Sequence, residues 1–227
     1  MTLAHSTVVA AFKGLTNLVC RIDDEQLKKV PDRGPLIIVA NHVNMLEIPL
    51  IYARLLPRPV TALVRADRWE SAGYRWLLNV CGAIPLRRGE ADLTAVRRTI
   101  DRLKEGDIVI IAPEGTRSGH GRLQKAHPGV VLLALHSGAP VLPLVHFGSE
   151  HYGDRLRRLR RAEFHIRVGR PFNLDPGGRQ VTRQVRRQMV DEIMYQMAAL
   201  LPPAYRGVYS NLGAATEQYL AFQDDPG

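Results

Sequence analysis

Apolar and polar residues follow one another along the chain in blocks that predict alternating strands and helices. Short runs rich in β-branched residues, bounded by polar or turn-forming residues, are typical of buried strands. Longer segments in which apolar residues recur every three or four positions are typical of amphipathic helices. The short runs predict strands near residues 36–40, 60–65, 82–86, 107–112, 141–147 and 162–168. The periodic segments predict helices near residues 47–56, 69–79, 90–104, 128–137 and 179–200.

This order of elements indicates an α/β fold. We expect a single domain over residues 30–201, with a largely parallel or mixed central sheet flanked by helices. No internal repeat or obvious linker interrupts it. Beyond this domain the hydrophobic periodicity is lost, and residues 202–227 are expected to form an irregular tail over the surface.

Residues 1–29 form a separate N-terminal segment that begins with an amphipathic helical pattern. The apolar residues that recur there at helical spacing are Leu3, Val8, Phe12, Leu15 and Val19. No stretch of the chain is long and apolar enough to predict a membrane span, and Lys13 would lie near the middle of any span at this end. Two interpretations remain open, a helix packed on the domain and a helix lying in the membrane interface.

The charge of the chain favours a phosphate-bearing partner. Lysine and arginine number 31 against 22 acidic residues, a formal net charge of +9, and most of the basic residues are arginine, which binds phosphate bidentately. The densest cluster, residues 155–161, interleaves arginines with two leucines. A solvated surface and contact with a membrane surface explain this cluster equally well. Nucleic acid is disfavoured as a partner, because no recognised binding signature or interleaved aromatic residue accompanies the arginines.

The two cysteines indicate a reducing compartment. Cys20 and Cys81 have neither C-x-x-C spacing nor histidines at metal-ligand spacing. We therefore expect two reduced, packed thiols and no metal site.

The most informative stretch reads Pro-Glu-Gly-Thr-Arg-Ser at residues 113–118, directly after an apolar run. A strand that ends there delivers a carboxylate, a glycine, a hydroxyl and a guanidinium to the carboxyl edge of a sheet, where open α/β folds bind ligands. A second apolar run is followed by Asn41 and His42, and a carboxylate, Glu47, lies five residues beyond the histidine. If both strands belong to one parallel sheet, the two loops share one pocket.

His42 and Glu47 form a candidate catalytic pair. They cannot pair within one regular helix, because residues five apart point about 140° away from each other. The histidine is therefore expected in the turn before a helix, from which Glu47 folds back to hold one imidazole nitrogen while the other accepts a proton from a hydroxyl. A capping box from Asn44 to Glu47 is the structural alternative. Pro49 favours the pair, since it would remove a helical hydrogen bond if the helix began after Asn44.

A third apolar run, residues 82–86, ends in Arg87 and Arg88. Arg88 and Arg117, both at strand ends, form a candidate phosphate clamp. Gly115 between them would let backbone N–H groups approach a ligand or a developing oxyanion. Arginines beside a histidine predict a site for an anionic substrate.

Four motifs in this order resemble those of the glycerolipid acyltransferase family, which makes phosphatidic acid from lysophosphatidic acid. They are Asn41-His42 with Glu47, Gly82 through Arg88, Pro113 through Ser118, and the proline-containing strand Val141 through Leu144. The resemblance extends over about residues 30–172. The family usually has aspartate where this chain has Glu47, one methylene longer, at a position where distance controls how the imidazole is held.

The resemblance implies roles for the matching residues. His42 would be the general base, oriented by Glu47, and no acyl-enzyme intermediate is needed. The segment 141–144 would support the site or an acyl channel. Lys125 would meet the phosphates of the acyl donor, with a solvated lysine as the alternative. The implied substrate-binding residues are Arg88, Glu114, Gly115, Thr116 and Arg117.

The implied reaction moves a fatty acyl group from acyl-coenzyme A or acyl carrier protein to lysophosphatidic acid, with no metal and no other cofactor. The expected partners are the lysophospholipid, the thioester, an anionic membrane surface and acyl carrier protein. The expected location is the cytoplasmic face of the membrane, peripheral or anchored at the interface. The alternatives are acylation of another lysophospholipid, glycerol phosphate or a polar-lipid hydroxyl, and a non-catalytic lipid-binding protein.

Overall fold

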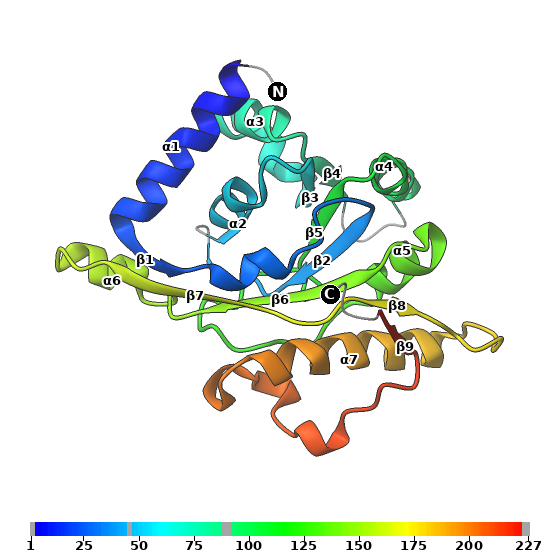
Figure 1. The fold of residues 1–227 in the computed structure, drawn as a ribbon. Helices are drawn as coiled ribbons and strands as arrows, with labels where there is room; N and C mark the ends of the chain where they lie inside the picture. Colours follow the sequence, from blue (N-terminus) through cyan, green and yellow to red (C-terminus); the bar gives the residue numbers. More distant parts are fainter. Residues whose placement is uncertain (1–2, 45–46, 88–91, 224–227) are drawn as a thin grey trace.

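The computed structural model describes residues 3–44, 47–87 and 92–223, in which nine strands form one mixed sheet with helices on both faces (Figure 1). The strands are β1 (Cys20–Asp23), β2 (Leu36–Ala40), β3 (Val60–Arg65), β4 (Ile84–Leu86), β5 (Ile108–Ile111), β6 (Val141–Phe147), β7 (Ala162–Val168), β8 (Phe172–Leu174) and β9 (Leu220–Phe222). The α-helices are α1 (Leu3–Val19), α2 (Glu47–Leu55), α3 (Ala72–Val80), α4 (Leu93–Lys104), α5 (Gly129–Ser137), α6 (Tyr152–Arg157) and α7 (Arg183–Leu200). The 3₁₀ helices are η1 (Glu25–Lys29), η2 (Ala66–Glu70), η3 (Pro203–Tyr205), η4 (Gly207–Tyr209) and η5 (Leu212–Ala214).

The centre of the sheet is parallel and one flank is antiparallel. Strands β6, β2, β5, β3 and β4 are neighbours in that order and run parallel. Strand β7 pairs antiparallel with β6 and parallel with β1, and β8 pairs antiparallel with β6 and β9. In the central register, Ile37 lies beside Val109 and Val141. The carboxyl ends of β2, β3, β5 and β6 therefore meet at one edge of the sheet.

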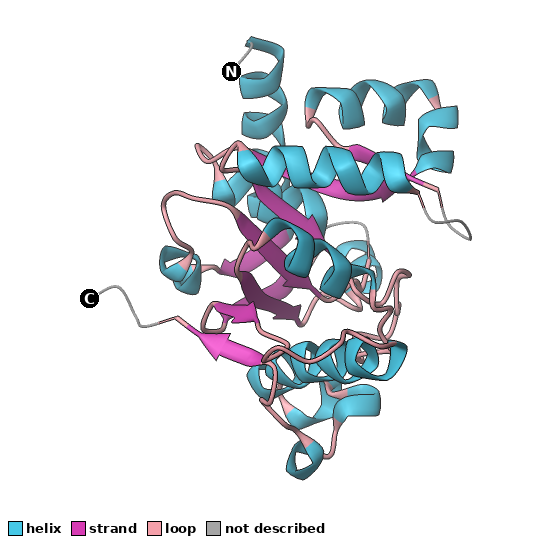
Figure 2. Cartoon of the chain, turned by 90° about the vertical axis from the view of Figure 1, so that its right-hand side faces the viewer, coloured by secondary structure: helices cyan, strands magenta, loops and turns pink. Residues whose placement is uncertain are grey.

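The apolar runs are explained by burial on both faces of the sheet. All five residues of β2 are buried, as is typical of a strand covered from both sides. Because successive side chains of a strand point to opposite faces, Ile37 and Val39 pack in the core with α5 and α7, whereas Leu36 and Ile38 pack with α2. In Figure 1, α1 and α2 lie above the sheet and α7 below it, and Figure 2 shows the strands between these layers.

The six strands and five helices predicted from the hydrophobic pattern are all present, and the α/β domain with a mixed sheet is confirmed. The segment expected as one helix over 69–79 is divided between η2 and α3. The pattern missed β1, β8 and β9, which have three or four residues each, and α6, which has six. Elements this short contain too few residues to show a hydrophobic period.

The last segment is not the irregular tail that the sequence predicts. It forms η3, η4, η5 and β9, which joins the sheet beside β8. Glu192 of α7, 1% exposed, holds it in place by accepting hydrogen bonds from the Thr216 hydroxyl at 2.6 Å and the Tyr219 amide at 3.0 Å. This attachment depends on one buried carboxylate and one short strand, neither of which produces a hydrophobic period in the sequence.

Helix α1 packs on the domain through one face. Its Thr16 is buried, and Arg54 of α2 donates to the Asn17 side chain at 2.6 Å and to Asp24 at 2.7 Å. Leu15 (56%) and Leu18 (73%) of the same helix remain exposed. Packing on the domain is therefore confirmed, and contact of the outer face with a membrane stays a prediction. Among the described helices, none combines the length and apolarity required to cross a bilayer.

Candidate active site

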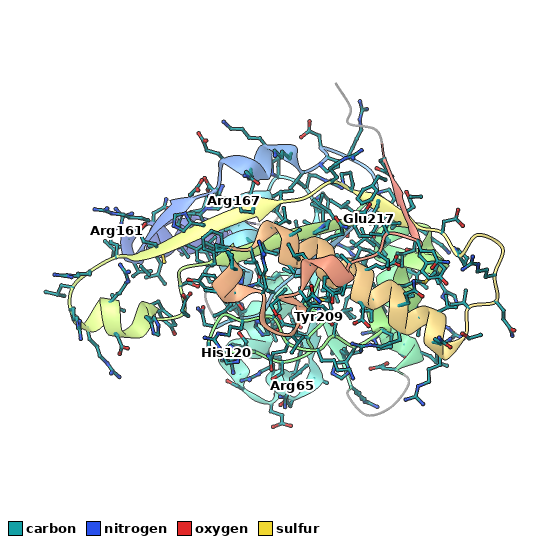
Figure 3. The ribbon with its side chains drawn as sticks, turned by 90° about the horizontal axis from the view of Figure 1, so that it is seen from below. Arg65, His120, Arg161, Arg167, Tyr209 and Glu217 are labelled. Carbon is teal, nitrogen blue, oxygen red and sulfur yellow. The ribbon has the colours of Figure 1, made fainter. Side chains whose placement is uncertain are left out.

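The turn after β2 and the loop after β5 meet at the carboxyl edge of the sheet. The Ser118 amide donates to the carbonyl of His42 at 2.7 Å, and the Gly119 amide donates to that of Val43 at 3.1 Å. This contact follows from the register of β2 and β5, which lie side by side and parallel. Figure 3 labels Arg65, the last residue of β3, and His120, which follows the β5 loop.

Glu47 holds the imidazole of His42. Helix α2 begins at Glu47, whose Oε1 accepts a hydrogen bond from Nδ1 of His42. The same carboxylate accepts from the amides of Val43 at 3.1 Å and Asn44 at 3.0 Å. The capping role and the orienting role, which the sequence left as alternatives, are therefore combined in one side chain. Pro49 is the third residue of α2, within the first turn, where proline is tolerated.

The environment of Glu47 keeps it ionised and fixes the tautomer of His42. Burial raises the pKa of Glu47, but the hydrogen bond from His42, the charge interactions with the His146 and His42 imidazoles and the hydrogen bond from the Asn44 amide together outweigh burial, so the pKa lies below the ordinary glutamate value. An ionised carboxylate only accepts hydrogen bonds, so Nδ1 is the protonated nitrogen in the neutral form of His42, and the lone pair of that form is on Nε2. No described residue hydrogen-bonds Nε2. This is the state that a general base requires.

The peptide that joins Asn41 to His42 is held from both sides. The His42 amide donates to Oε1 of Glu114 at 3.1 Å, and the Asn41 carbonyl accepts from Nε2 of His146 at 3.0 Å. The Asn41 side chain also exchanges two hydrogen bonds of 2.9 Å with the backbone of His146. The position of the catalytic candidate is thus determined by the loop after β5 and by β6 as well as by its own turn.

Glu114 acts in the framework of the site. It is 2% exposed, and its second oxygen accepts from the Gln124 amide at 2.9 Å. Both oxygens are therefore bound to backbone amides, and the side chain lines neither cavity beside His42. The structure thus places Glu114 against the His42 amide, and the substrate contact that the resemblance implies for it stays a prediction. Its pKa is raised, because burial outweighs the hydrogen bonds from those amides.

Two cavities open at His42. The larger, about 540 Å³, runs between α1, α2 and α3, and its lining is mostly apolar: Phe12, Pro49, Tyr52, Ala62, Val64, Tyr74, Leu77, Leu78, Cys81 and Ala83. The smaller, about 220 Å³, is lined by His42 and Glu47 together with Arg65 and Leu86 and the loop residues 115–117. His42, Arg68 and Arg117 line both cavities. The site therefore places a base and two guanidinium groups between an apolar cavity and a second cavity that carries a third guanidinium group, that of Arg65.

The family model described as Acyltransferase matches residues 21–146, which is more than half of the chain and contains all four motifs. The chain belongs to this acyltransferase family. A lyso-ornithine lipid O-acyltransferase from Pseudomonas aeruginosa is 35% identical over 115 residues, which cover 49% of this chain and 43% of the relative. A 1-acyl-sn-glycerol-3-phosphate acyltransferase from the same organism is 26% identical over 143 residues, covering 61% of this chain and 54% of the relative.

The fold is also that of a solved member of the family. The crystal structure of the 1-acyl-sn-glycerophosphate acyltransferase PlsC from Thermotoga maritima matches 86% of this chain and 78% of its own chain, with a TM-score of 0.64 and 23% identity. The curated relatives are longer than the part that aligns, since the matches span 36–43% of the length of the first three. The resemblance drawn from the motifs is thereby confirmed at the level of family and fold.

The remaining predicted residues have different outcomes. Gly115, Thr116 and Arg117 line the smaller cavity, as expected of a substrate-binding loop. Gly115 has φ +67°, and a Cβ there would meet the His127 ring at 3.1 Å, so glycine is required at this position. Arg88 lies outside the described residues. Lys125 lines a separate cavity against α7 and does not contribute to the cavities at His42.

The sequence analysis missed two arginines of the site, Arg65 and Arg68. Arg65 ends β3 and donates to Asp67 at 3.1 Å, whereas Arg68 in η2 reaches both cavities. A signal was present, because a basic residue directly after a predicted parallel strand lies at the ligand-binding edge. His146 was missed as well, and no local pattern marks it, since its partner Asn41 is 105 residues away.

Proposed function

We propose that this chain transfers a fatty acyl group from an acyl thioester to the hydroxyl of lysophosphatidic acid, giving phosphatidic acid. One observation carries the proposal. Glu47 holds His42 with its lone pair on Nε2, and His42 lines the apolar and the arginine-bearing cavity together with Arg68 and Arg117. A hydroxyl, an acyl chain and a phosphate can be accommodated there around a single base.

The residues supply the steps of a direct transfer. Nε2 of His42 removes the proton from the hydroxyl as its oxygen forms a bond to the thioester carbonyl carbon. Glu47 stabilises the imidazolium that results. The carbon–sulfur bond then breaks, and the imidazolium returns the proton to the leaving thiolate. No residue of the chain becomes acylated, and the proton and the acyl group are both accounted for.

The two cavities support the assignment of the substrates. The apolar cavity suits an acyl chain, because burial of each methylene group is favourable by about 0.8 kcal/mol. Arg68 and Arg117 suit a phosphate, which guanidinium groups bind through charge-assisted hydrogen bonds. The donor is proposed to be acyl-coenzyme A or acyl carrier protein, and the lipid substrates place the enzyme at a membrane surface.

A second candidate acceptor is lyso-ornithine lipid. This acceptor is favoured by the lyso-ornithine lipid O-acyltransferase from Pseudomonas aeruginosa, which is 35% identical to this chain over 115 residues. The two acceptors differ in charge, since an ornithine head group carries an ammonium group beside its carboxylate, whereas lysophosphatidic acid carries a phosphate with no positive charge beside it. The two guanidinium groups that line both cavities attract the phosphate more strongly than a zwitterionic head group, and for that reason lysophosphatidic acid is the leading proposal.

The test is an acceptor panel at a fixed donor. Purified protein receives palmitoyl-coenzyme A with lysophosphatidic acid, lyso-ornithine lipid, monoacylglycerol or glycerol 3-phosphate, and the products are quantified by mass spectrometry. We expect the highest kcat/KM with lysophosphatidic acid and no turnover in His42→Ala. Equal rates with monoacylglycerol would refute the phosphate-binding role of Arg68 and Arg117. Lipid binding without turnover in the wild-type protein would instead support the non-catalytic alternative.

A further inference from the structure

Helix α6 and the residues that follow it present apolar side chains to solvent among arginines. Leu159 is 95% exposed and has φ +53°, a left-handed conformation that is uncommon for a residue other than glycine. Leu156, three residues earlier, is 48% exposed. We call this surface the α6 patch; it consists of Arg155, Leu156, Arg157, Arg158, Leu159 and Arg160, all of them exposed.

The charge of the α6 patch is almost uncompensated. Its one ion pair among the described residues joins Arg157 to Asp154 at 3.6 Å, with both side chains more than half exposed. Such a pair contributes little in water. The described residues provide no ion pair for Arg155, Arg158 or Arg160. Intramolecular contacts therefore explain neither the arginines nor the leucines of this segment.

The α6 patch lies at the same edge of the sheet as His42. Helix α6 follows β6 after four residues, and one of these, Ser149, accepts hydrogen bonds from the Asn44 side chain at 3.1 Å and 3.0 Å. The contact links the start of α6 to the turn that carries His42. A partner bound to the patch would therefore lie at the edge of the sheet that carries the site.

The exposed leucines of α1 extend the patch. Arg161, directly after it, donates to the carbonyl oxygens of Asn17 and Cys20 at the end of α1. Leu18, 73% exposed, lies on this end of α1. In Figure 1 the end of α1 and α6 lie at the same end of the sheet, and Figure 3 labels Arg161 there.

We propose that the α6 patch docks this protein on an anionic bilayer, with the leucines in the interface and the arginines at the lipid phosphates. Charge complementarity supports this partner, since clustered arginines are attracted to anionic leaflets. The leucines favour a bilayer over an acidic protein, because interfacial segments insert apolar side chains between basic ones. The orientation rests on the proposed function, because it brings the cavities of a lipid-modifying site to the surface that holds the lipids.

The experiment measures binding of the full chain to vesicles without substrates. Vesicles of phosphatidylcholine alone are compared with vesicles of equal parts phosphatidylcholine and phosphatidylglycerol in a sedimentation assay. The variants are Arg157→Glu/Arg158→Glu and Leu156→Ser/Leu159→Ser. The matched controls are Arg97→Glu/Arg98→Glu on α4, an exposed arginine pair, and Leu132→Ser on α5, a leucine that is 38% exposed.

We expect the wild-type protein to bind the anionic vesicles, each α6 variant to lose about tenfold or more in partitioning, and each control to lose less than twofold. Retained vesicle binding in both α6 variants would overturn the proposal. An equal loss in the α4 control would also overturn it, by showing that net charge alone attracts the protein. Loss of binding to acyl carrier protein, with vesicle binding unchanged, would assign the patch to an acidic protein instead.

Two further measurements keep these outcomes interpretable. The melting temperature of each variant reports its folding, which exposed substitutions are expected to leave unchanged. Turnover of short-chain, monomeric substrates reports the proposed activity apart from any membrane. Vesicle binding without turnover would refute the proposed function but support the docking surface. Turnover without vesicle binding would support the proposed function and refute the docking surface.

Discussion

His146 and Asn41 are joined by three hydrogen bonds that position the candidate general base. Nε2 of His146 donates to the Asn41 carbonyl at 3.0 Å, and the Asn41 side chain exchanges two bonds of 2.9 Å with the His146 backbone. His146 is fully buried and stacks on Phe164 with ring centroids 5.0 Å apart. Burial lowers the pKa of His146, so the ring is neutral and carries its proton on Nε2.

Removal of this donor is expected to slow catalysis without weakening substrate binding. In His146→Phe the stacking is retained, but the Asn41 carbonyl loses its partner, so the peptide before His42 is held from one side only. We expect kcat to fall about 10- to 100-fold with KM unchanged, since a small misplacement of a catalytic group costs that much. His146→Gln, whose amide can donate to the same carbonyl, is expected to recover part of the loss. Equal kcat in His146→Phe and wild type, measured on folded protein, would contradict the positioning role.

Substitution of Glu47 is expected to affect both rate and stability. Glu47→Gln removes the charge that stabilises the imidazolium and orients the ring, and we expect kcat to fall about 10³- to 10⁴-fold. Glu47→Asp restores the residue usual in the family but shortens the reach to Nδ1, and a loss of about tenfold is expected. Steady-state kinetics with a single acceptor distinguishes these results. A higher kcat in Glu47→Gln than in Glu47→Asp would contradict the orienting role of the carboxylate.

The stabilising effect of Glu47 is expected to depend on pH. Its folded-state pKa is lowered relative to the unfolded value of about 4.3. A depressed carboxylate pKa contributes stability that is present above the unfolded pKa and lost as the pH falls through the folded pKa. Wild type should therefore exceed Glu47→Gln in melting temperature at pH 7, and the difference should shrink below about pH 4.3. A constant difference from pH 7 to pH 3 would argue against an ionised Glu47.

Arg68 is expected to contribute to binding of the acceptor phosphate. It lines both cavities at His42, and hydrogen bonds to charged groups contribute about 1.5–3 kcal/mol. In Arg68→Ala we expect KM for lysophosphatidic acid to rise about 10- to 100-fold, with KM for monoacylglycerol unchanged. Arg97→Ala on α4, exposed and away from the cavities, is the control. A parallel rise of KM for both acceptors would show that Arg68 acts on the fold and not on the phosphate.

The apolar cavity is expected to select the acyl chain by its length. Cys81 lines this cavity, and an indole in its place would shorten the space. In Cys81→Trp we expect kcat/KM for palmitoyl-coenzyme A to fall at least about tenfold relative to octanoyl-coenzyme A, because a single methylene group that no longer fits costs about 1–3 kcal/mol. Leu132→Trp, on the far side of the sheet, serves as the control. An equal loss for both donors would mean that the cavity does not hold the acyl chain.

Local sequence patterns were sufficient to predict the main strands and helices and the pairing of His42 with Glu47. Strands such as β2 and β5 are predictable because they are apolar throughout, which follows from burial on both faces. The pairing of His42 with Glu47 is predictable because both residues lie in one turn, where the start of α2 returns the carboxylate to the ring. These features depend on residues a few positions apart.

Strand order and register decided the rest. They turned Glu114 toward the His42 amide, and they brought His146 to Asn41 across 105 residues. They also placed Arg68 at both cavities and Lys125 against α7. A side chain at a strand end contacts the residues of the adjacent strand and of the loop that follows it. The packing of the whole sheet decides which strand is adjacent. Chemistry within one turn can therefore be inferred from the chain alone, whereas contacts between loops appear only in the folded protein.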